Sequence, residues 1–276
     1  MKRIVSIQDI SCLGKCSLTV ALPIISAMGV ECSIVPTAVL STHTMFQNFT
    51  CKDLTDQIGP IAAHWKAEKL GFDAIYTGYL ASKEQIGDVC AFFDQFKTDK
   101  NLIVVDPVMA DNGKLYPAFG EDFPAEMAKV CAKADLIVPN LTEASLLTGL
   151  PYKTEYDEDY IRQMLQALAK LGPRYVALTG VSFEKGKLGV MYYDQQTGQY
   201  GSYFAEHLPA SFHGTGDVFA STCVGALMRG KSLGDALALA ADYTVECIRA
   251  TLASADHAWY GVDFETAIPY LVDRLR

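Results

Sequence analysis

The feature that most restricts the fold of this chain is a regular alternation of short apolar runs with longer amphipathic segments. The runs at 102–106 (LIVVD) and 135–139 (DLIVP) are continuously apolar between their ends, which is typical of strands buried on both faces of a parallel sheet. Strand–helix repetition of this kind predicts a mostly parallel sheet with helices on both faces. The predicted strands are 2–8, 31–36, 73–77, 101–105, 135–138 and 174–179, and the predicted helices between them are 15–28, 53–69, 83–97, 122–133 and 157–171.

The pattern changes after Gly180. Segments 187–193 and 200–206 alternate around the turn sequence QQTGQ, which predicts an antiparallel hairpin on the edge of the sheet. Three further helices are predicted, at 215–228, 232–250 and 262–274. The sequence has no internal repeat, linker or low-complexity stretch, so we expect residues 1–276 to form a single domain.

The charge and the cysteines exclude several classes of protein. The formal net charge of −9 argues against a surface that binds nucleic acid or an anionic membrane. No apolar run approaches the roughly 20 residues that a membrane span needs, and the N-terminal MKRIVSIQDI lacks the features of a signal peptide. The eight cysteines are scattered, without a Cys-x-x-Cys pair, and we expect them to be reduced. We therefore expect a cytoplasmic protein.

Polar residues follow several predicted strands. Ligands of open α/β sheets bind beyond the carboxyl ends of the strands, so residues in these positions are candidates for a site. By themselves they indicate only an α/β enzyme with an unknown ligand, because polar residues and glycines commonly end strands. The candidates are Asp9, Thr77-Gly78-Tyr79, Asp106-Pro107, Asn140 and Thr179-Gly180.

The strongest local signal is Gly214-Thr215-Gly216-Asp217, followed by the helix-like VFASTCVGALM. A glycine-rich turn that opens a helix presents free N–H groups and the positive end of the helix dipole to an anion. Asp217 would lie beside a phosphate held there, and phosphoryl transfer needs both such donors and a carboxylate that accepts the proton of the attacking hydroxyl. The alternative is an ordinary helix start in which Asp217 only favours the dipole.

A second phosphate-binding pattern is fortuitous. Residues 225–232 (GALMRGKS) match G-x-x-x-x-G-K-[ST], but that loop must leave a strand and open a helix. Here Gly225 lies inside the helix predicted from 215, and Gly230 resembles its C-terminal stop. No G-x-G-x-x-G follows the first strand, so a dinucleotide oxidoreductase has little support.

The GTGD turn before a helix near the C-terminal end of an α/β chain resembles the ribokinase superfamily. The segments SIQDISCLGK, STHT, YTGYL, VVDPVMAD, VPNLTEASLLTG and FHGTGDVFA resemble the pyridoxal/pyridoxamine kinase branch, in the same order and over nearly the whole chain. This resemblance implies a ribokinase-like three-layer sandwich. It also implies ATP-dependent phosphorylation of the 5′-hydroxymethyl group of a B6 vitamer (pyridoxal, pyridoxine or pyridoxamine). Magnesium, a candidate monovalent cation and a homodimer are implied as well.

The resemblance also assigns roles to residues of the catalytic centre. It implies that Asp217 is the base and that Gly214, Thr215 and Gly216 form the anion hole. Asp106 and Asp111 would lie near the phosphates and cations, and Glu143 would organise magnesium, largely through water, since magnesium keeps much of its hydration shell.

Further roles follow for the nucleotide and the vitamer. Asn140 and Thr179, with the adjacent Gly180, would line the channel of the ATP phosphates. Thr44 and Tyr79 would contact the vitamer, and 111–122 would form a flap that excludes water. Structural explanations stand beside these roles: packing at a strand end for Tyr79, loop capping for Thr44 and turn formation for Asp106. His43, a lone histidine, is interpreted as structural.

Two positions depart from the branch, and a third separates the chain from the hydroxymethylpyrimidine kinases. Asp9 stands where serine is usual, and we hypothesise that its carboxylate pairs with the protonated ring nitrogen or the aminomethyl group and favours pyridoxamine. Val138 stands where relatives often carry threonine. His213 precedes GTGD, whereas hydroxymethylpyrimidine kinases carry a cysteine-bearing glycine loop. The alternatives are a hydroxymethylpyrimidine or sugar kinase of the same superfamily, and a non-catalytic protein that binds a vitamer or nucleotide.

Overall fold

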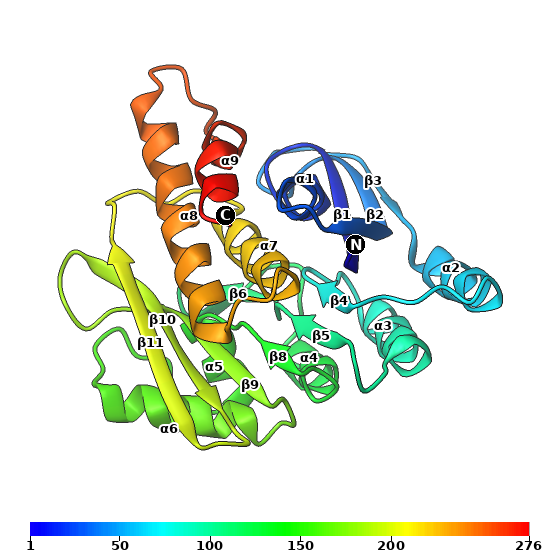
Figure 1. Cartoon of the computed structure of the whole chain (residues 1–276), viewed down its shortest axis with the longest axis horizontal. Coiled ribbons are helices and arrows are strands. Elements are labelled where there is room, and N and C mark those ends of the chain that lie inside the picture. Colours follow the sequence, from blue (N-terminus) through cyan, green and yellow to red (C-terminus); the bar gives the residue numbers. More distant parts are fainter. Residues whose placement is uncertain (276) are drawn as a thin grey trace.

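The computed structural model describes residues 1–275, and within them nine strands form one sheet (Figure 1). The strands are β1 (Arg3–Leu13), β2 (Glu31–Thr42), β3 (Cys51–Asp53), β4 (Ala74–Thr77), β5 (Leu102–Val105), β6 (Ala110–Asp111), β7 (Lys114–Leu115), β8 (Leu136–Ile137), β9 (Tyr175–Val181), β10 (Lys187–Asp194) and β11 (Gln199–Glu206). Their order in the sheet is β11-β10-β9-β8-β5-β4-β1-β2-β3, while β6 and β7 form a separate hairpin. The strands from β9 to β2 pair in parallel. The β10–β11 hairpin is antiparallel at one edge, so the predicted fold class is confirmed.

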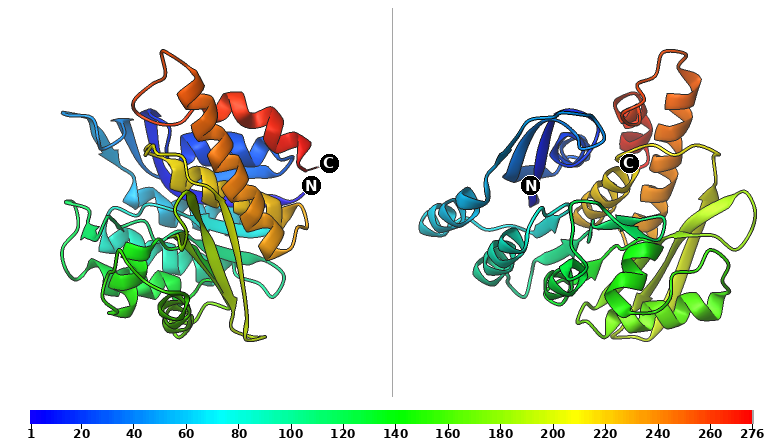
Figure 2. Two further views of the ribbon diagram at one scale, coloured as in Figure 1. Left: turned by 90° about the vertical axis from the view of Figure 1, so that its left-hand side faces the viewer. Right: turned by 180° about the vertical axis from the view of Figure 1, so that it is seen from behind.

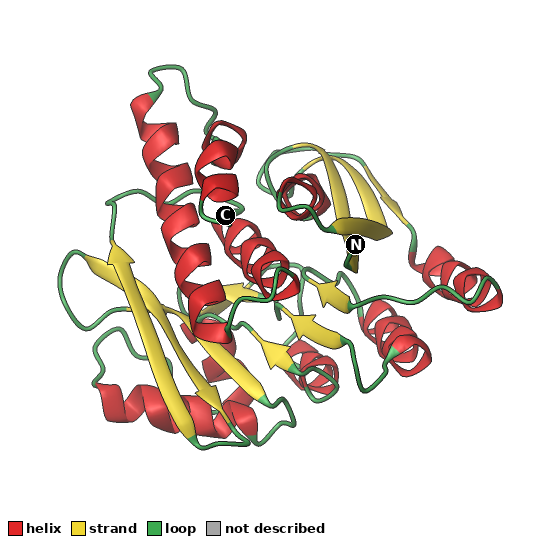
Figure 3. Cartoon of the chain, viewed as in Figure 1, coloured by secondary structure: helices red, strands yellow, loops and turns green. Residues whose placement is uncertain are grey.

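Helices cover both faces of this sheet and give three layers (Figures 1 and 2). Helices α1, α7, α8 and α9 pack together on one face, and α2 to α6 form the layer on the other. Figure 3 shows the same layers with helices in red and strands in yellow. The helices are α1 (Leu18–Ala27), α2 (Thr55–Ala67), α3 (Lys83–Phe96), α4 (Phe123–Cys131), α5 (Leu141–Thr148), α6 (Glu158–Ala169), α7 (Thr215–Met228), α8 (Leu233–Ala253) and α9 (Phe264–Asp273).

Each central strand contributes to two cores. Successive side chains of a strand point to opposite faces of the sheet. In β4, Ile75 therefore packs under α2 and α3, while Ala74 and Tyr76 pack under α1 and α7. All four residues of β4 are buried. This double burial explains why the strands appear in the sequence as continuous apolar runs instead of alternating ones.

The first predicted strand, 2–8, is too short, because β1 continues to Leu13. Gln8 is paired with Pro36 and Ile10 with Val39, so two residues of β2 lie opposite the single residue Asp9. A bulge of this kind re-aims a side chain and bends the ribbon. Asp9 therefore lies within the strand and not after it. Beyond the bulge, β1 ends in the exposed residues Cys12 and Leu13.

Four short elements were not predicted, namely β3, α5 and the two strands of the β6–β7 hairpin. Strand β3 has three exposed residues, which carry no hydrophobic pattern. Helix α5 has eight residues and begins at a capping box: the Asn140 side chain accepts the N–H of Glu143 (2.9 Å) and the Glu143 carboxylate accepts the N–H of Asn140 (2.9 Å). Gly149, with φ of 72°, ends the helix. The N-x-x-E spacing is a recognisable signal for such a start.

Other sequence predictions are settled by the same structure. Gly225 lies inside α7 and Gly230, with φ of 84°, follows its end, so 225–232 is not a phosphate-binding loop between a strand and a helix. The cysteines are free. Within the described chain no helix combines the length and apolarity needed to cross a membrane.

Candidate active site

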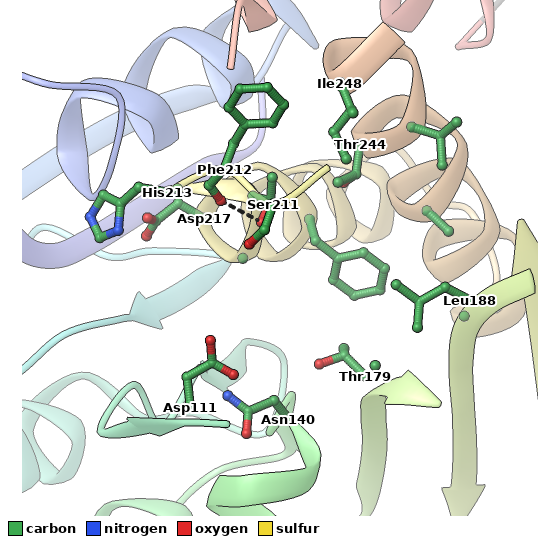
Figure 4. A pocket seen from close by; sticks show the side chains of 18 of the residues that line it. Asp111, Asn140, Thr179, Leu188, Ser211, Phe212, His213, Asp217, Thr244 and Ile248 are labelled. Atoms are coloured by element: carbon green, nitrogen blue, oxygen red, sulfur yellow. Dashed lines mark hydrogen bonds between the residues drawn. The ribbon is translucent and has the colours of Figure 1, made fainter. Parts of the chain in front are cut away.

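The predicted catalytic, nucleotide and metal residues line one cavity of about 470 Å³. It lies at the carboxyl ends of the central strands, between the start of α7, the side of α8 and the loops after β5 and β8 (Figure 4). The vitamer candidates Asp9, Thr44 and Tyr79 are not part of its wall. The predicted residues that line it are Asp106, Asp111, Asn140, Glu143, Thr179, Gly180, Gly214, Thr215, Gly216 and Asp217.

The turn at Gly214 requires glycine for two reasons. Its φ of 81° lies in the left-handed region, which disfavours residues with a Cβ. A Cβ at this position would also lie 1.8 Å from the carbonyl oxygen of Lys15. The turn is thus packed directly against the β1–α1 loop. Residues 214–217 line the cavity, and the first N–H groups of α7 have no acceptor within the helix. This geometry suits a phosphate oxygen.

Asp217 lies in the first turn of α7, at the end of the cavity nearest the N-terminal strands (Figure 4). Burial among protein groups, together with the negative charge of Asp9, raises the pKa of its carboxyl from 3.8 to about 7. A carboxylate with a pKa near neutrality is suited to accept a proton from a substrate hydroxyl.

Two further carboxyls lie in the cavity wall without a basic partner. Asp106 and Glu143 are 8% and 3% exposed. Burial raises the pKa of both, and the Glu143 carboxylate raises that of Asp106. Among residues 1–275, neither forms an ion pair with a lysine or arginine. Such oxygen donors fit a hard cation like Mg²⁺. No group of three or more acidic, histidine or cysteine side chains in that range could hold a metal, so phosphate and water oxygens would complete its shell.

The segment predicted as a flap contains a tight hairpin. Asn112 and Gly113, with φ of 50° and 77°, connect β6 and β7, as expected for the Asn-Gly turn of a two-residue hairpin. The Gly113 N–H donates to Thr142 Oγ1 (2.9 Å), which anchors the turn on α5. Tyr116, just beyond β7, lines the cavity. Whether the segment moves as a flap stays a prediction.

The structure brings together two of the three predicted vitamer residues. Asp9 is 6% exposed and accepts a hydrogen bond from Ser11 Oγ (3.3 Å). Burial, followed by the charge of Asp9, raises the pKa of Tyr79, whose ring packs 5.5 Å from that of Phe119. The negative charge of Asp9 acts on both Asp217 and Tyr79, so both groups lie within electrostatic range of Asp9. Thr44 is exposed in the turn after β2. Among residues 1–275, no hydrogen bond places its side chain near Asp9 or Tyr79.

His43 has a structural role, as the sequence suggested. Its Nδ1 accepts the N–H of Met45 (3.2 Å), so Nε2 carries the proton and donates to the Tyr260 carbonyl (3.0 Å). Burial lowers its pKa, which also favours the neutral ring. His213, whose ring lies 4.4 Å from that of His43, has its pKa lowered to about 4 by burial and by His43. Both histidines are therefore neutral at pH 7.

Sequence reasoning missed the apolar half of the cavity. It is formed by the start of β10, the segment before α7 and one side of α7 and α8. These residues carry no signal in the sequence, because apolar residues that line a cavity have the same periodicity as those that pack in a core. They are Leu188, Leu208, Phe212, Phe219, Val245 and Ile248.

Comparison with known proteins identifies the family. The family model described as phosphomethylpyrimidine kinase matches residues 22–260. The chain belongs to the phosphomethylpyrimidine kinase family. A pyridoxal kinase of Pasteurella multocida, PdxY, is 30% identical over 252 residues, which cover 84% of this chain and 83% of that protein. The chain is thus a kinase of a family that contains pyridoxal kinases.

Two solved structures of kinases resemble the whole chain. A Bacteroides thetaiotaomicron protein assigned to the phosphomethylpyrimidine kinases, crystallised with pyridoxal, superposes with a TM-score of 0.93 at 41% identity. The match covers 98% of this chain and 95% of that one. Pyridoxal kinase of Lactobacillus plantarum superposes with a TM-score of 0.90 at 32% identity, over 99% and 97% of the two chains. The predicted resemblance is therefore confirmed, and the family includes kinases named for two classes of acceptor.

Proposed function

We propose that this kinase transfers the γ-phosphoryl group of ATP to the 5′-hydroxymethyl group of a B6 vitamer. The observation that carries the proposal is the position of Asp217. It lies in the first turn of α7 with a pKa near 7, at the boundary between the cavity and the region around Asp9 and Tyr79. The pyridoxal in the crystals of the Bacteroides protein supports a vitamer as the acceptor.

The cavity offers separate environments for the two ends of a nucleotide. The adenine ring would lie against the apolar half, between Phe219 and the side of α8 at Val245 and Ile248. The triphosphate would extend along the strand ends to the turn at Gly214. Asn140 lines this path, but its side-chain oxygen caps α5 and its amide donates to the Ala110 carbonyl (2.9 Å). We therefore expect Asn140 to shape the channel, with Thr179 and Gly180 opposite.

In the transfer step, Asp217 lies between the acceptor hydroxyl on one side and the γ-phosphoryl group on the other. The 5′-oxygen forms a bond to the γ-phosphorus while the bond from that phosphorus to the bridging oxygen of ADP breaks. The hydroxyl proton passes to the Asp217 carboxylate, and ADP leaves with the bridging oxygen. The first amides of α7, at Thr215, Gly216 and Asp217, donate to the phosphoryl oxygens as their charge changes. Most of the acceleration would come from positioning and electrostatic stabilisation.

Magnesium would be held on the side of Asp106, Asp111 and Glu143 and would neutralise phosphate charge. The Glu143 carboxylate already accepts the N–H groups of Asn140 (2.9 Å) and Met109 (3.1 Å). These bonds fix its direction, so it can orient water around the ion without binding the ion itself. The exposed Asp111 would lie nearer the solvent side.

Asp9 bears on the choice among vitamers. Its carboxylate accepts a hydrogen bond from the Ser11 hydroxyl (3.3 Å), while the neighbouring His43 is neutral. A protonated pyridine nitrogen or aminomethyl group would supply the positive charge that this buried carboxylate lacks. Asp9→Ser should therefore lower the ratio of kcat/KM for pyridoxamine to that for pyridoxal. An unchanged ratio would remove Asp9 from this role.

The second candidate acceptor is hydroxymethylpyrimidine or its phosphate, and the family description favours it. An assay of ADP release with pyridoxal, pyridoxine, pyridoxamine and hydroxymethylpyrimidine at equal concentrations separates the two. We expect kcat/KM to be highest for a vitamer. A higher value for the pyrimidine would reverse the assignment, and no acceptor-dependent ADP release would indicate a binding protein.

A further inference from the structure

Segment 109–113, which contains the turn between β6 and β7, is bonded to the start of α5. The Glu143 carboxylate accepts the N–H of Met109 (3.1 Å), and the Asn140 amide donates to the Ala110 carbonyl (2.9 Å). Glu143 and Asn140 also form the capping box of α5. The same two side chains therefore begin the helix and hold this segment against it.

Thr142 makes a third bond to the segment, and this bond has no function within the helix. Its Oγ1 accepts the N–H of Gly113 (2.9 Å), which is 29 residues away in the chain. The Thr142 residue is 3% exposed, and the N-cap of α5 is Asn140. Helix capping therefore does not explain why a buried threonine hydroxyl occupies this position.

The turn is also contacted by a residue beyond the far end of α5. A Cβ at Gly113 would lie 2.9 Å from Cδ1 of Tyr152, so the Tyr152 ring touches the backbone of the turn. Strands β6 and β7 have two residues each, and a two-stranded hairpin alone is marginally stable at best. The position of this hairpin therefore depends on its contacts with Thr142 and Tyr152.

The same turn fixes the carboxylate of Asp111. Asp111 Oδ1 accepts the backbone N–H of Asn112 (2.8 Å), and Oδ2 accepts the Asn112 side-chain amide (3.0 Å). The Asp111 side chain extends into the cavity (Figure 4), and among residues 1–275 it forms no ion pair with a lysine or arginine. Its direction is thus set by Asn112, whose neighbour Gly113 is the residue that Thr142 holds.

We infer that Thr142 is a positioning residue, which holds the turn at Asn112 and Gly113 so that the Asp111 carboxylate faces the magnesium and phosphates of a bound nucleotide. Thr142 itself does not line the cavity and acts through the turn. The inference rests on the proposed function, because it needs magnesium on the side of Asp111, but it does not depend on which acceptor is phosphorylated.

Thr142→Val tests this role, because it keeps the shape of the side chain and removes only the acceptor of the Gly113 N–H. Losing a partner that orients a metal ligand costs about 10–100-fold in metal affinity. We expect the Kd of ADP measured by calorimetry with Mg²⁺ to rise about 10-fold, while the Kd of ADP in EDTA stays within about twofold. Thr142→Ser keeps the hydroxyl and should restore the wild-type Kd.

Hydrogen exchange followed by NMR reports on the bond itself. We expect the Gly113 amide to exchange about 10-fold faster in Thr142→Val and at the wild-type rate in Thr142→Ser. Thr148→Val is the matched control at the other end of α5, because the Thr148 hydroxyl donates to the Ala144 carbonyl (2.7 Å) and does not line the cavity. It should leave the exchange of Gly113 and both Kd values unchanged.

A double-mutant cycle shows whether Thr142 acts through Asp111. Asp111→Asn should itself raise the Kd of ADP measured with Mg²⁺. In that background Thr142→Val should raise this Kd little further, because the carboxylate that Thr142 positions is already lost.

Several results would overturn the inference. They are an unchanged exchange rate of Gly113 in Thr142→Val, a wild-type Kd with Mg²⁺ in that variant, an equal loss with and without Mg²⁺, and losses that simply add to that of Asp111→Asn. Absence of ADP release with every vitamer would instead refute the proposed function, and it would leave the comparison of nucleotide binding intact.

Discussion

Replacing Gly214 by alanine tests the anion-binding turn, and the structure provides a matched control at the other end of α7. Gly214 and Gly230 have φ of 81° and 84°, so alanine at either position costs about 1–2 kcal/mol in backbone strain. For a chain of this size that lowers Tm by about 2–4 °C per kcal/mol. At Gly230 the new Cβ meets no atom within 4 Å, whereas at Gly214 it lies 1.8 Å from the Lys15 carbonyl oxygen.

The clash at Gly214 can be relieved only if the turn and the Lys15 loop move apart by about 1 Å, a displacement that costs about 10²-fold in rate. Loss of one donor to a developing charge costs about 10²–10³-fold in kcat. We expect Gly214→Ala to lose activity in this range in a coupled assay of ADP release. Gly230→Ala should retain wild-type kcat with a similar loss of Tm from strain. Equal activity of the two variants would refute this role for Gly214. Loss of activity in Gly230→Ala alone would point to residues 225–232 instead.

Four further predictions concern the carboxyl groups. Asp217→Asn should lower kcat by at least about 10³-fold with little change in the Kd of ATP measured by calorimetry, and a loss below tenfold would exclude Asp217 as the base. Because the pKa of Asp217 is raised from 3.8 to about 7 in the fold, its destabilising effect is absent below about pH 4, grows between pH 4 and 7, and is complete above about pH 7. Asp217→Asn should therefore raise Tm more at pH 8 than at pH 5, and an equal change at both would contradict the raised pKa. In the wild type, kcat should fall as pH decreases below about 7, and a rate independent of pH from 5 to 8 would contradict a base with this pKa. Glu143→Gln should raise the Mg²⁺ concentration for half-maximal activity about 10-fold, and an unchanged requirement would place the ion elsewhere.

The sequence predicts the sheet because burial on both faces leaves a strong signal. Continuous apolar runs such as 102–106, the hairpin around QQTGQ and the glycine turn at Gly214 each follow from a local rule that the structure obeys. The ligand-bearing edge follows too, because parallel strands end at the same side of a sheet. Asp106, Asn140, Thr179 and Asp217, which are distant in sequence, therefore meet in one cavity.

The features that the sequence analysis did not predict share a physical cause. Each depends on how strands pair or on backbone conformation in the folded chain, and no local sequence pattern specifies either. The bulge at Asp9 depends on the pairing of β1 with β2, which no residue of β1 specifies by itself. The left-handed φ of Ser17, which is 51°, depends on the contacts of the preceding Lys15 loop with Asp263 and Gly214, and serine is an unexpected residue for it. The apolar half of the cavity has the composition of a core. These features needed the assembled fold.

The most direct test of the central claim is a single-turnover experiment with enzyme in excess over pyridoxal, in the presence of ATP and Mg²⁺. Formation of the 5′-phosphate is followed by phosphorus NMR and mass spectrometry. We predict one phosphate on the 5′-oxygen per pyridoxal with the wild-type protein and none on the same timescale with Asp217→Asn. Recovery of unmodified pyridoxal from the wild-type reaction, or equal product with both proteins, would contradict the account.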